Sequence, residues 1–174
     1  LEGFKIANGK YVGFVDADMA TSPASFYDLY KNIGSYGGII GSRWLKNSRT
    51  KRSLGKYIRS KGFNYLVRSL FLFPYKDTQC GAKIFRTKPI KEIIEEIKSI
   101  KWAFDVNLLY LLRKHGYRIK EHPTIWVDKE GSKISPKVPI QMAMGVIRLR
   151  LNYSPFKFIV RLYDKLPEAI KIHH

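Results

Sequence analysis

Short apolar runs typical of β-strands alternate with helical patterns along this chain, and this alternation limits the possible folds more than any other feature. The strand patterns occur at residues 11–15, 37–43, 82–86 and 117–128. Neighbouring parallel strands need a long connection, usually a helix, so this alternation is typical of layered α/β domains. We therefore predict an α/β fold with a mostly parallel sheet.

Capping residues and apolar spacing mark the helices. Thr21 or Ser22 can cap a helix that has Pro23 in its first turn. A second helix, over residues 54–71, is predicted to be amphipathic, because apolar residues recur along it at helical spacing. Further helices are predicted over residues 88–100 and 103–116, and a mobile loop over the polar, basic residues 44–53.

The predicted helix over residues 54–71 has two chemically different sides. Its apolar side consists of six residues: Leu54, Tyr57, Ile58, Tyr65, Leu66 and Leu70. Basic and polar residues one turn apart occupy the other side, where they are available to ligands. These residues are Lys56, Arg59 and Ser60.

Two acids follow the first predicted strand at once, in the sequence FVDADM. Residues two apart on an extended chain point to the same side, so Asp16 and Asp18 can converge on one ligand. Hard cations such as Mg²⁺ or Mn²⁺ bind carboxylates and take their remaining ligands from substrate phosphates. The alternative is a strand that simply ends in a turn, where Asp is common.

The charge of the chain favours anionic partners. Its 174 residues include 32 Lys and Arg against 14 Asp and Glu, a net charge of +18. No acidic residue occurs between Asp28 and Asp77, although basic residues are frequent there. Such a segment predicts a surface for nucleic acid, anionic lipid headgroups or phosphorylated small molecules, and charge alone does not choose among them.

Other features exclude several classes of protein. The single cysteine, Cys80, can form no internal disulfide, and a reducing compartment is the default expectation. The four histidines have no zinc-ligand spacing. No apolar run is long enough for a membrane-spanning helix, and the first residues do not resemble a signal peptide.

The chain changes character after Pro139, so we divide it into a domain over residues 1–138 and a basic amphipathic helical tail over residues 139–174. In the tail, Met, Ile, Leu, Phe and Tyr alternate with Arg and Lys, and no acid occurs before Asp164. This pattern fits a helix pair at a membrane interface. It fits equally well an ordinary helix pair packed on the domain.

Five stretches in order resemble the polyprenyl-phosphate sugar synthases of glycosyltransferase family 2, which include dolichyl-phosphate β-glucosyltransferases and dolichyl-phosphate mannose synthases. The stretches are ANGKYVGFVDADMAT, IIGSR, DTQCGAKIF, WAFDVNLLYLL and GSKISP followed by IQM. Each is weak alone, and their order makes the match specific. DTQCG together with FDV points to the glucosyl branch.

The resemblance implies a Rossmann-like GT-A fold and an inverting transfer of a sugar from a nucleotide-sugar to a polyprenyl (dolichyl) phosphate. The donor is expected to be UDP-glucose or GDP-mannose, with glucose favoured. The enzyme is expected to lie peripherally on the cytoplasmic face of a membrane. Motifs that open the family's domain are absent, so we expect this chain to be its C-terminal part, without the N-terminal βαβ units and with an exposed sheet edge.

The resemblance also implies roles for individual residues. Asp18 would carry most of the metal contact to the donor diphosphate, with Asp16 beside the ribose and the metal. The acceptor phosphate would be held by Arg43 and, in the following helix, by Lys56, Arg59 and Ser60. Two further motif acids, Asp77 and Asp105, join Asp16 and Asp18 as candidate catalytic residues.

Two positions depart from the family pattern. Ala20 stands where mannose synthases often have a metal-binding glutamine, which favours the glucosyl branch or a water molecule in place of that ligand. Asn107 replaces the acid of the usual FDVE motif, so any role of that acid is lost or moved.

Two rival functions remain. A nucleic-acid-binding domain is permitted by the charge, but paired acids would repel phosphate without a metal, and no nucleic-acid-binding motif occurs. We therefore expect no nucleic-acid partner. The other rival is a membrane-binding fragment without catalytic activity.

Overall fold

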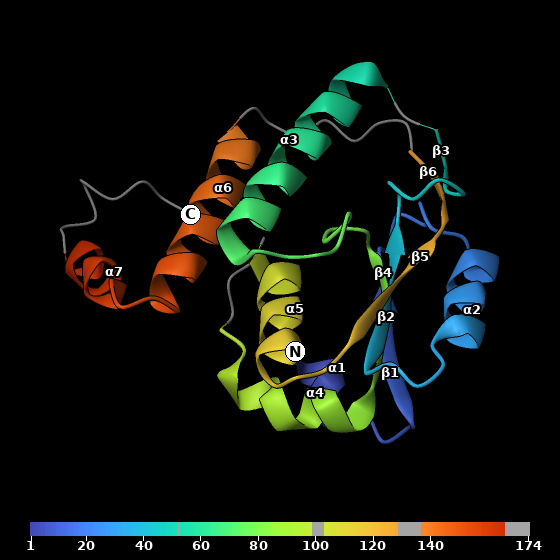
Figure 1. The fold of residues 1–174 in the computed structure, drawn as a ribbon, viewed down its shortest axis with the longest axis horizontal. Helices are drawn as coiled ribbons and strands as arrows, with labels where there is room; N and C mark the ends of the chain where they lie inside the picture. The colour runs from blue at the N-terminus through green and yellow to red at the C-terminus, as the bar shows by residue number, and fades with distance from the viewer. Residues whose placement is uncertain (52, 99–102, 129–136, 166–174) are drawn as a thin grey trace.

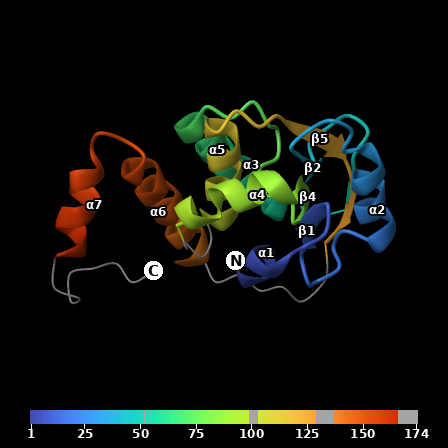
Figure 2. The ribbon, with the colours of Figure 1, turned by 90° about the horizontal axis from the view of Figure 1, so that it is seen from below.

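The computed structural model describes residues 1–51, 53–98, 103–128 and 137–165. The GSKISP stretch and the end of the helix predicted over residues 88–100 lie outside the described residues. So does the last part of the predicted tail. The described chain forms an α/β fold in which helices cover both faces of one central sheet (Figure 1, Figure 2).

The central sheet contains four strands in the order β1, β4, β2, β5. Strand β4 runs antiparallel to both of its neighbours, and only β2 and β5 are parallel. The prediction of a mostly parallel sheet is therefore wrong, because the sheet is mixed. The strands are β1 (Tyr11–Val15), β2 (Gly38–Ser42), β4 (Ala82–Arg86) and β5 (Ile119–Pro123).

The path of the chain between β2 and β4 explains the mixed sheet. Helix α3 (Leu54–Phe71) does not return the chain to the start of the strands, as a βαβ crossover would. The segment that follows α3 stays at the carboxyl ends of β1 and β2, where Asp16 N donates to Gly81 O (2.9 Å) and Arg43 N to Asp77 Oδ2 (2.9 Å). The chain therefore enters β4 from that end and must run antiparallel.

A second, two-stranded sheet lies beside the ends of the central strands. Strand β3 (Arg49–Lys51) pairs in parallel with β6 (Ile125–Val127), and Thr21 forms an isolated bridge to Trp126. Residues 44–53 are therefore not only a loop, as predicted. Three exposed polar residues give no alternating pattern, so this strand could not be recognised from the sequence.

The other predicted helices are present in the described residues, but the one predicted over residues 88–100 is shorter: the α-helix ends at Ile93, one 3₁₀ turn follows, and Ile97 is extended. Ser22 caps α2 (Pro23–Asn32), since its side chain accepts a hydrogen bond from Ser25 N (3.2 Å). Helix α2 covers one face of the sheet, and α4 and α5 cover the other (Figure 1). The bounds of these helices and of two shorter ones nearby are α1 (Glu2–Ile6), α4 (Thr87–Ile93), η1 (Ile94–Glu96) and α5 (Phe104–Lys114).

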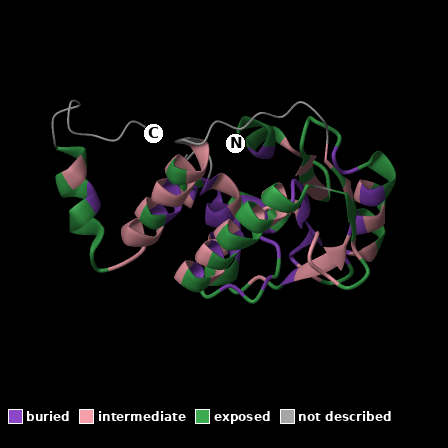
Figure 3. Cartoon of the chain, turned by 90° about the horizontal axis from the view of Figure 1, so that it is seen from above, coloured by how far each residue is buried: buried purple, intermediate pink, exposed green. Residues whose placement is uncertain are grey.

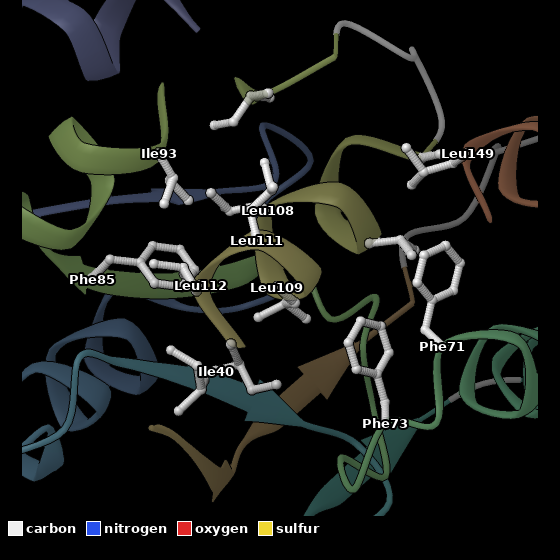
Figure 4. Packing of buried hydrophobic residues seen from close by; sticks show 14 of the residues in the cluster. Ile40, Phe71, Phe73, Phe85, Ile93, Leu108, Leu109, Leu111, Leu112 and Leu149 are labelled. Atoms are coloured by element: carbon white, nitrogen blue, oxygen red, sulfur yellow. The ribbon is translucent and has the colours of Figure 1, made fainter. Parts of the chain in front are cut away.

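Successive side chains of a strand point to opposite faces of the sheet, and they belong to two hydrophobic clusters, one on each face. Ile39 faces α2 and packs with Leu29, whereas Ile40 faces the larger cluster. Buried residues gather between the sheet and its helices (Figure 3). Leu108 and Leu112 of α5 lie over Phe85 and Ile40 of the sheet (Figure 4). Helices thus cover both faces over β4 and β2, whereas the edge strand β1 has no buried residue and lines an open cavity beside α2.

Helix α3 presents a different side to the core from the one its sequence predicts. Its buried residues are Asn64, Val67 and Phe71. The predicted apolar side is divided: Tyr57, Leu66 and Leu70 are half-buried, and the other three members are exposed. Those three are Leu54, Ile58 and Tyr65. The helix has apolar residues on two sides, so periodicity alone could not identify the buried one.

Two helices end the described chain, α6 (Lys137–Asn152) and α7 (Lys157–Asp164). Helix α6 joins the main core through Val146 and Leu149. Helix α7 buries Val160 but leaves Phe158 largely exposed. In the part of the chain that the structure describes, no helix is long and apolar enough to span a membrane. The division at residue 138 and the role of the tail stay predictions.

Candidate active site

The end of β1 turns sharply and exposes two carboxylates. Asp18 Oδ1 accepts a hydrogen bond from Ala20 N (2.9 Å), and Met19 N donates to Asp16 O (3.2 Å). Met19 has a left-handed backbone, with φ of 57°. The turn reading of the sequence is therefore correct as local structure. It leaves Asp16 and the second oxygen of Asp18 available to a ligand.

Asp16 lies in an acidic environment. Partial desolvation, followed by the charges of Asp105 and Asp18, raises its pKa above the ordinary value, and Lys83 and Arg43 oppose this shift without cancelling it. Negative charge at the end of β1 is thus undercompensated, and a divalent cation would relieve it. The Asp16 carboxylate lies against the backbone of Gly81.

Gly81 is required by the approach of the Asp16 carboxylate. A Cβ atom at residue 81 would lie 1.8 Å from Asp16 Oδ2, well inside van der Waals contact. Glycine is the residue that permits such an approach. The close contact with Asp16 therefore explains why DTQCG ends in glycine, and this contact could not be seen in the sequence.

Lys83 is a buried cation beneath this acidic group. Its side chain is fully buried, and its Nζ donates to Cys80 O (2.6 Å). Asp105 Oδ1 lies 3.1 Å from Nζ, close enough for an ion pair although not aligned as a hydrogen bond. Nζ also lies 5.4 Å from the centre of the Phe14 ring. Lys83 thus links β4 to the start of α5, where Asp105 lies.

Sequence reasoning missed Lys83, although a signal was available. In the strand AKIFR, alternation puts residue 83 on the same face as the core residue Phe85. A lysine on a core-facing position needs an acidic partner, because an unpaired buried charge is very costly. That partner is Asp105, one of the predicted catalytic residues.

Arg43 and Asp77 form a buried two-point ion pair at the end of β2. Arg43 Nε donates to Asp77 Oδ2 (2.7 Å), and Nη2 donates to Oδ1 (2.9 Å). Burial opposes ionisation of both groups, but their mutual attraction and hydrogen bonds lower the pKa of Asp77 and raise that of Arg43. Asp77 therefore remains ionised and orients the guanidinium, which also lies 5.6 Å from the ring of Trp126.

The predicted acceptor-binding residues of α3 form a group apart from the ends of β1 and β2. Lys56 Nζ is 2.7 Å from Asp128 Oδ2, which follows β6. Ser60 is half-buried, and Arg59 is exposed. The structure thus brings together Asp16, Asp18, Asp105 and Arg43, while the α3 residues form a second group on one helix.

The residues of the β1 end suit a metal that is completed by substrate. In the described ranges, no group of three or more His, Cys, Asp and Glu side chains could hold a metal ion by itself. Proteins nevertheless usually bind Mg²⁺ through one or two carboxylates, and substrate phosphates and water supply the other ligands. Asp16 and Asp18 are the residues that could hold such an ion.

Asn107, which replaces the acid of the usual motif, has a structural contact instead. It is buried, its Nδ2 donates to Lys98 O (3.0 Å), and its Oδ1 accepts from Tyr153 (2.7 Å). Burial is the main cause that raises the pKa of Tyr153 to about 12. Asn107 therefore joins α5 to the end of α6 and faces away from Asp105 on the helix.

Fold and site together define an α/β protein with an acidic strand end and a neighbouring arginine, suited to phosphorylated ligands. Residues 1–94 match the model of Glycosyl transferase family 2. This chain belongs to that family, and its resemblance to the glucosyl branch is confirmed by its relatives.

Two dolichyl-phosphate beta-glucosyltransferases illustrate the similarity. The protein of Dictyostelium discoideum is 37% identical over 160 residues, which cover 87% of this chain and 49% of that protein. The protein of Homo sapiens is 34% identical over 161 residues, covering 87% of this chain and 50% of that protein. The chain thus spans about half the length of the curated relatives it matches.

Proposed function

We propose that this chain is the part of a glycosyltransferase that transfers a sugar, glucose in preference to mannose, from a nucleotide-sugar to a polyprenyl phosphate such as dolichyl phosphate. The reaction inverts the anomeric carbon, requires Mg²⁺ or Mn²⁺, and takes place at the cytoplasmic surface of a membrane. The names of the relatives support the lipid-phosphate acceptor and the choice of glucose.

One observation carries the proposal: undercompensated acids and a fixed arginine lie at the ends of nearby strands. Asp16 and Arg43 are close enough for the charge of each to influence the other. A donor diphosphate needs a cation, which the acids can bind, and an acceptor phosphate needs a donor of hydrogen bonds, which Arg43 supplies. Two phosphorylated substrates that repel each other can thus be held side by side.

The acceptor explains why no strong general base is needed. The second pKa of a phosphate monoester is about 6, so the acceptor is already largely a dianion at neutral pH. Asp77 is committed to Arg43, and Asp105 lies against Lys83. Both acids therefore act in our proposal by orienting cations, and neither removes a proton from the nucleophile.

The protein residues hold and orient the substrates. Asp16 and Asp18 bind the ion, which when present neutralises the charge that develops on the departing nucleoside diphosphate. Arg43 fixes the acceptor phosphate, and Lys56, Arg59 and Ser60 of α3 receive it from the membrane side. Electrostatic positioning is thus the main contribution of this chain.

The test is transfer of labelled sugar to polyprenyl phosphate from UDP-glucose and from GDP-mannose, with and without EDTA. It is run on this chain and on a form extended upstream in its reading frame, because the relatives are about twice as long. Glucose transfer that EDTA abolishes supports the proposal. Transfer by neither form, together with salt-sensitive DNA binding that ignores EDTA, would favour the nucleic-acid alternative.

A further inference from the structure

The outer side of α3 is apolar and has no partner within the described chain. Leu54, Ile58 and Tyr65 are 74%, 61% and 72% exposed. Their spacing puts them on one side of the helix, opposite the buried Val67 and Phe71. Large apolar side chains that share one exposed helix face mark an interaction surface. We call these three residues the outer stripe.

Cations accompany the outer stripe. Lys61 lies along it between Ile58 and Tyr65, and Arg68 lies about one turn after Tyr65. No Asp or Glu occurs in residues 29–76, so neither α3 nor the chain on either side of it supplies an acid. Lysine can keep its charge in water while its carbon chain lies along apolar material. The face therefore combines apolar contact with attraction to anions.

We infer that the outer stripe of α3 docks onto the surface of a bilayer with anionic headgroups. A bilayer satisfies both components of the surface: acyl chains take up the apolar side chains, and headgroups pair with the cations. A nucleic-acid backbone would match the charge and leave Leu54 and Ile58 without contacts. This inference rests on the proposed function, because a lipid-linked acceptor requires the site to reach a membrane.

The position of α3 gives the docking a consequence for the site. Lys56, in the first turn of the same helix, pairs with Asp128, and Tyr57 lies against Trp44 with ring centres 5.1 Å apart. The other end of α3 is fixed to α6, since Arg150 Nε donates to Leu70 O (2.8 Å). Docking of the outer stripe therefore fixes the α3 phosphate-binding residues, which lie on the other side of the same helix, next to the membrane surface.

A single fluorescent label tests where the membrane contact lies. Cys80 is buried, and burial raises the pKa of its thiol to about 11, so it does not compete for a thiol reagent at neutral pH. An environment-sensitive fluorophore attached to Ile58→Cys is mixed with vesicles of phosphatidylcholine containing about 30% phosphatidylserine. We expect a blue shift. The same label on Tyr27→Cys of α2 should report water.

Vesicle sedimentation gives the size of the effect. The variant Leu54→Ser/Ile58→Ser/Tyr65→Ser is expected to bind the same vesicles at least about tenfold more weakly, because three large side chains leave the lipid. Lys61→Gln should weaken binding a few-fold at low salt. Tyr27→Ser/Tyr30→Ser removes two exposed tyrosines from α2 and should leave binding unchanged. Circular dichroism of each variant checks that the helices remain.

Each outcome decides the inference independently of sugar transfer, since the vesicles contain neither acceptor nor donor. If the chain binds vesicles while the label at residue 58 stays in water, α3 is not the docking face and the inference fails. It also fails if the chain does not bind vesicles. The proposed function is tested separately, with acceptor in detergent, where docking is not required.

Discussion

The ends of β1 and β2 meet in one site but are built in opposite ways. At β2, Arg43 and Asp77 are buried and satisfy each other through two hydrogen bonds. At β1, Asp16 and Asp18 are exposed, and the pKa of Asp16 is raised by desolvation and by neighbouring acids. The β2 end holds its arginine in place without a ligand, whereas the β1 end has charge that only a ligand can compensate. Loss of Asp77 should therefore reduce stability, whereas changes at the β1 end should mainly reduce binding.

The largest effect on stability is expected from Asp77→Ala. Removing this carboxylate leaves Arg43 buried without its partner, which should cost about 3–5 kcal/mol in the free energy of unfolding. Urea denaturation followed by circular dichroism measures the loss. Asp164→Ala is the matched control, because its pair with Arg148 is exposed and should contribute less than about 1 kcal/mol. Equal losses in the two variants would contradict the contrast between the strand ends.

A smaller loss is expected from Lys83→Met, which tests the link between β4 and α5 beneath the β1 end. Methionine has a similar shape but leaves Cys80 O and Asp105 without their cation, at a cost of about 1–3 kcal/mol. Lys114→Met removes an exposed partner of Glu96 and serves as the control. If Lys83→Met is as stable as the original chain, Lys83 does not organise the site.

Much of the secondary structure could be predicted from local patterns. Strands β1, β2 and β4 and helices α2, α3 and α5 lie where apolar spacing and capping residues put them. The pair Asp16 and Asp18 was also visible, because acids that directly follow an apolar strand stand out. These features depend on a few neighbouring residues, which a sequence presents together.

Features that depend on distant parts of the chain were not predictable. The direction of β4 depends on which end of the sheet the chain reaches after α3. The side of α3 that is buried depends on its packing against α6 and the main core. Arg43 and Asp77 are 34 residues apart, and nothing local indicates their pairing. The contact of Gly81 with Asp16 was hidden for the same reason.

Gly81→Ala should separate binding from stability at the β1 end. The new Cβ displaces the Asp16 carboxylate, and since this side chain is exposed, the change should cost at most about 1 kcal/mol of stability. Affinity for Mn²⁺, measured by electron paramagnetic resonance with uridine diphosphate present, should fall about tenfold or more. Gly62→Ala is the control, because its Cβ would meet nothing within 4 Å. Unchanged Mn²⁺ affinity in Gly81→Ala would separate Asp16 from the metal.

The smallest change in stability, and the sharpest contrast with Asp77, is expected from Asp18→Asn. Asparagine keeps a side-chain oxygen that can accept the hydrogen bond from Ala20 N, so the turn after β1 should form and unfolding should change by less than about 0.5 kcal/mol. The amide removes the negative charge that a hard cation requires, so Mn²⁺ binding and metal-dependent sugar transfer should be lost. Asp28→Asn, in α2 beside His122 of β5, controls for a general change of charge, and binding should survive it. Sugar transfer at the original rate in Asp18→Asn would remove the metal role from the β1 end, and its exposed carboxylates would then need another cationic partner, such as a basic group supplied by residues outside this chain.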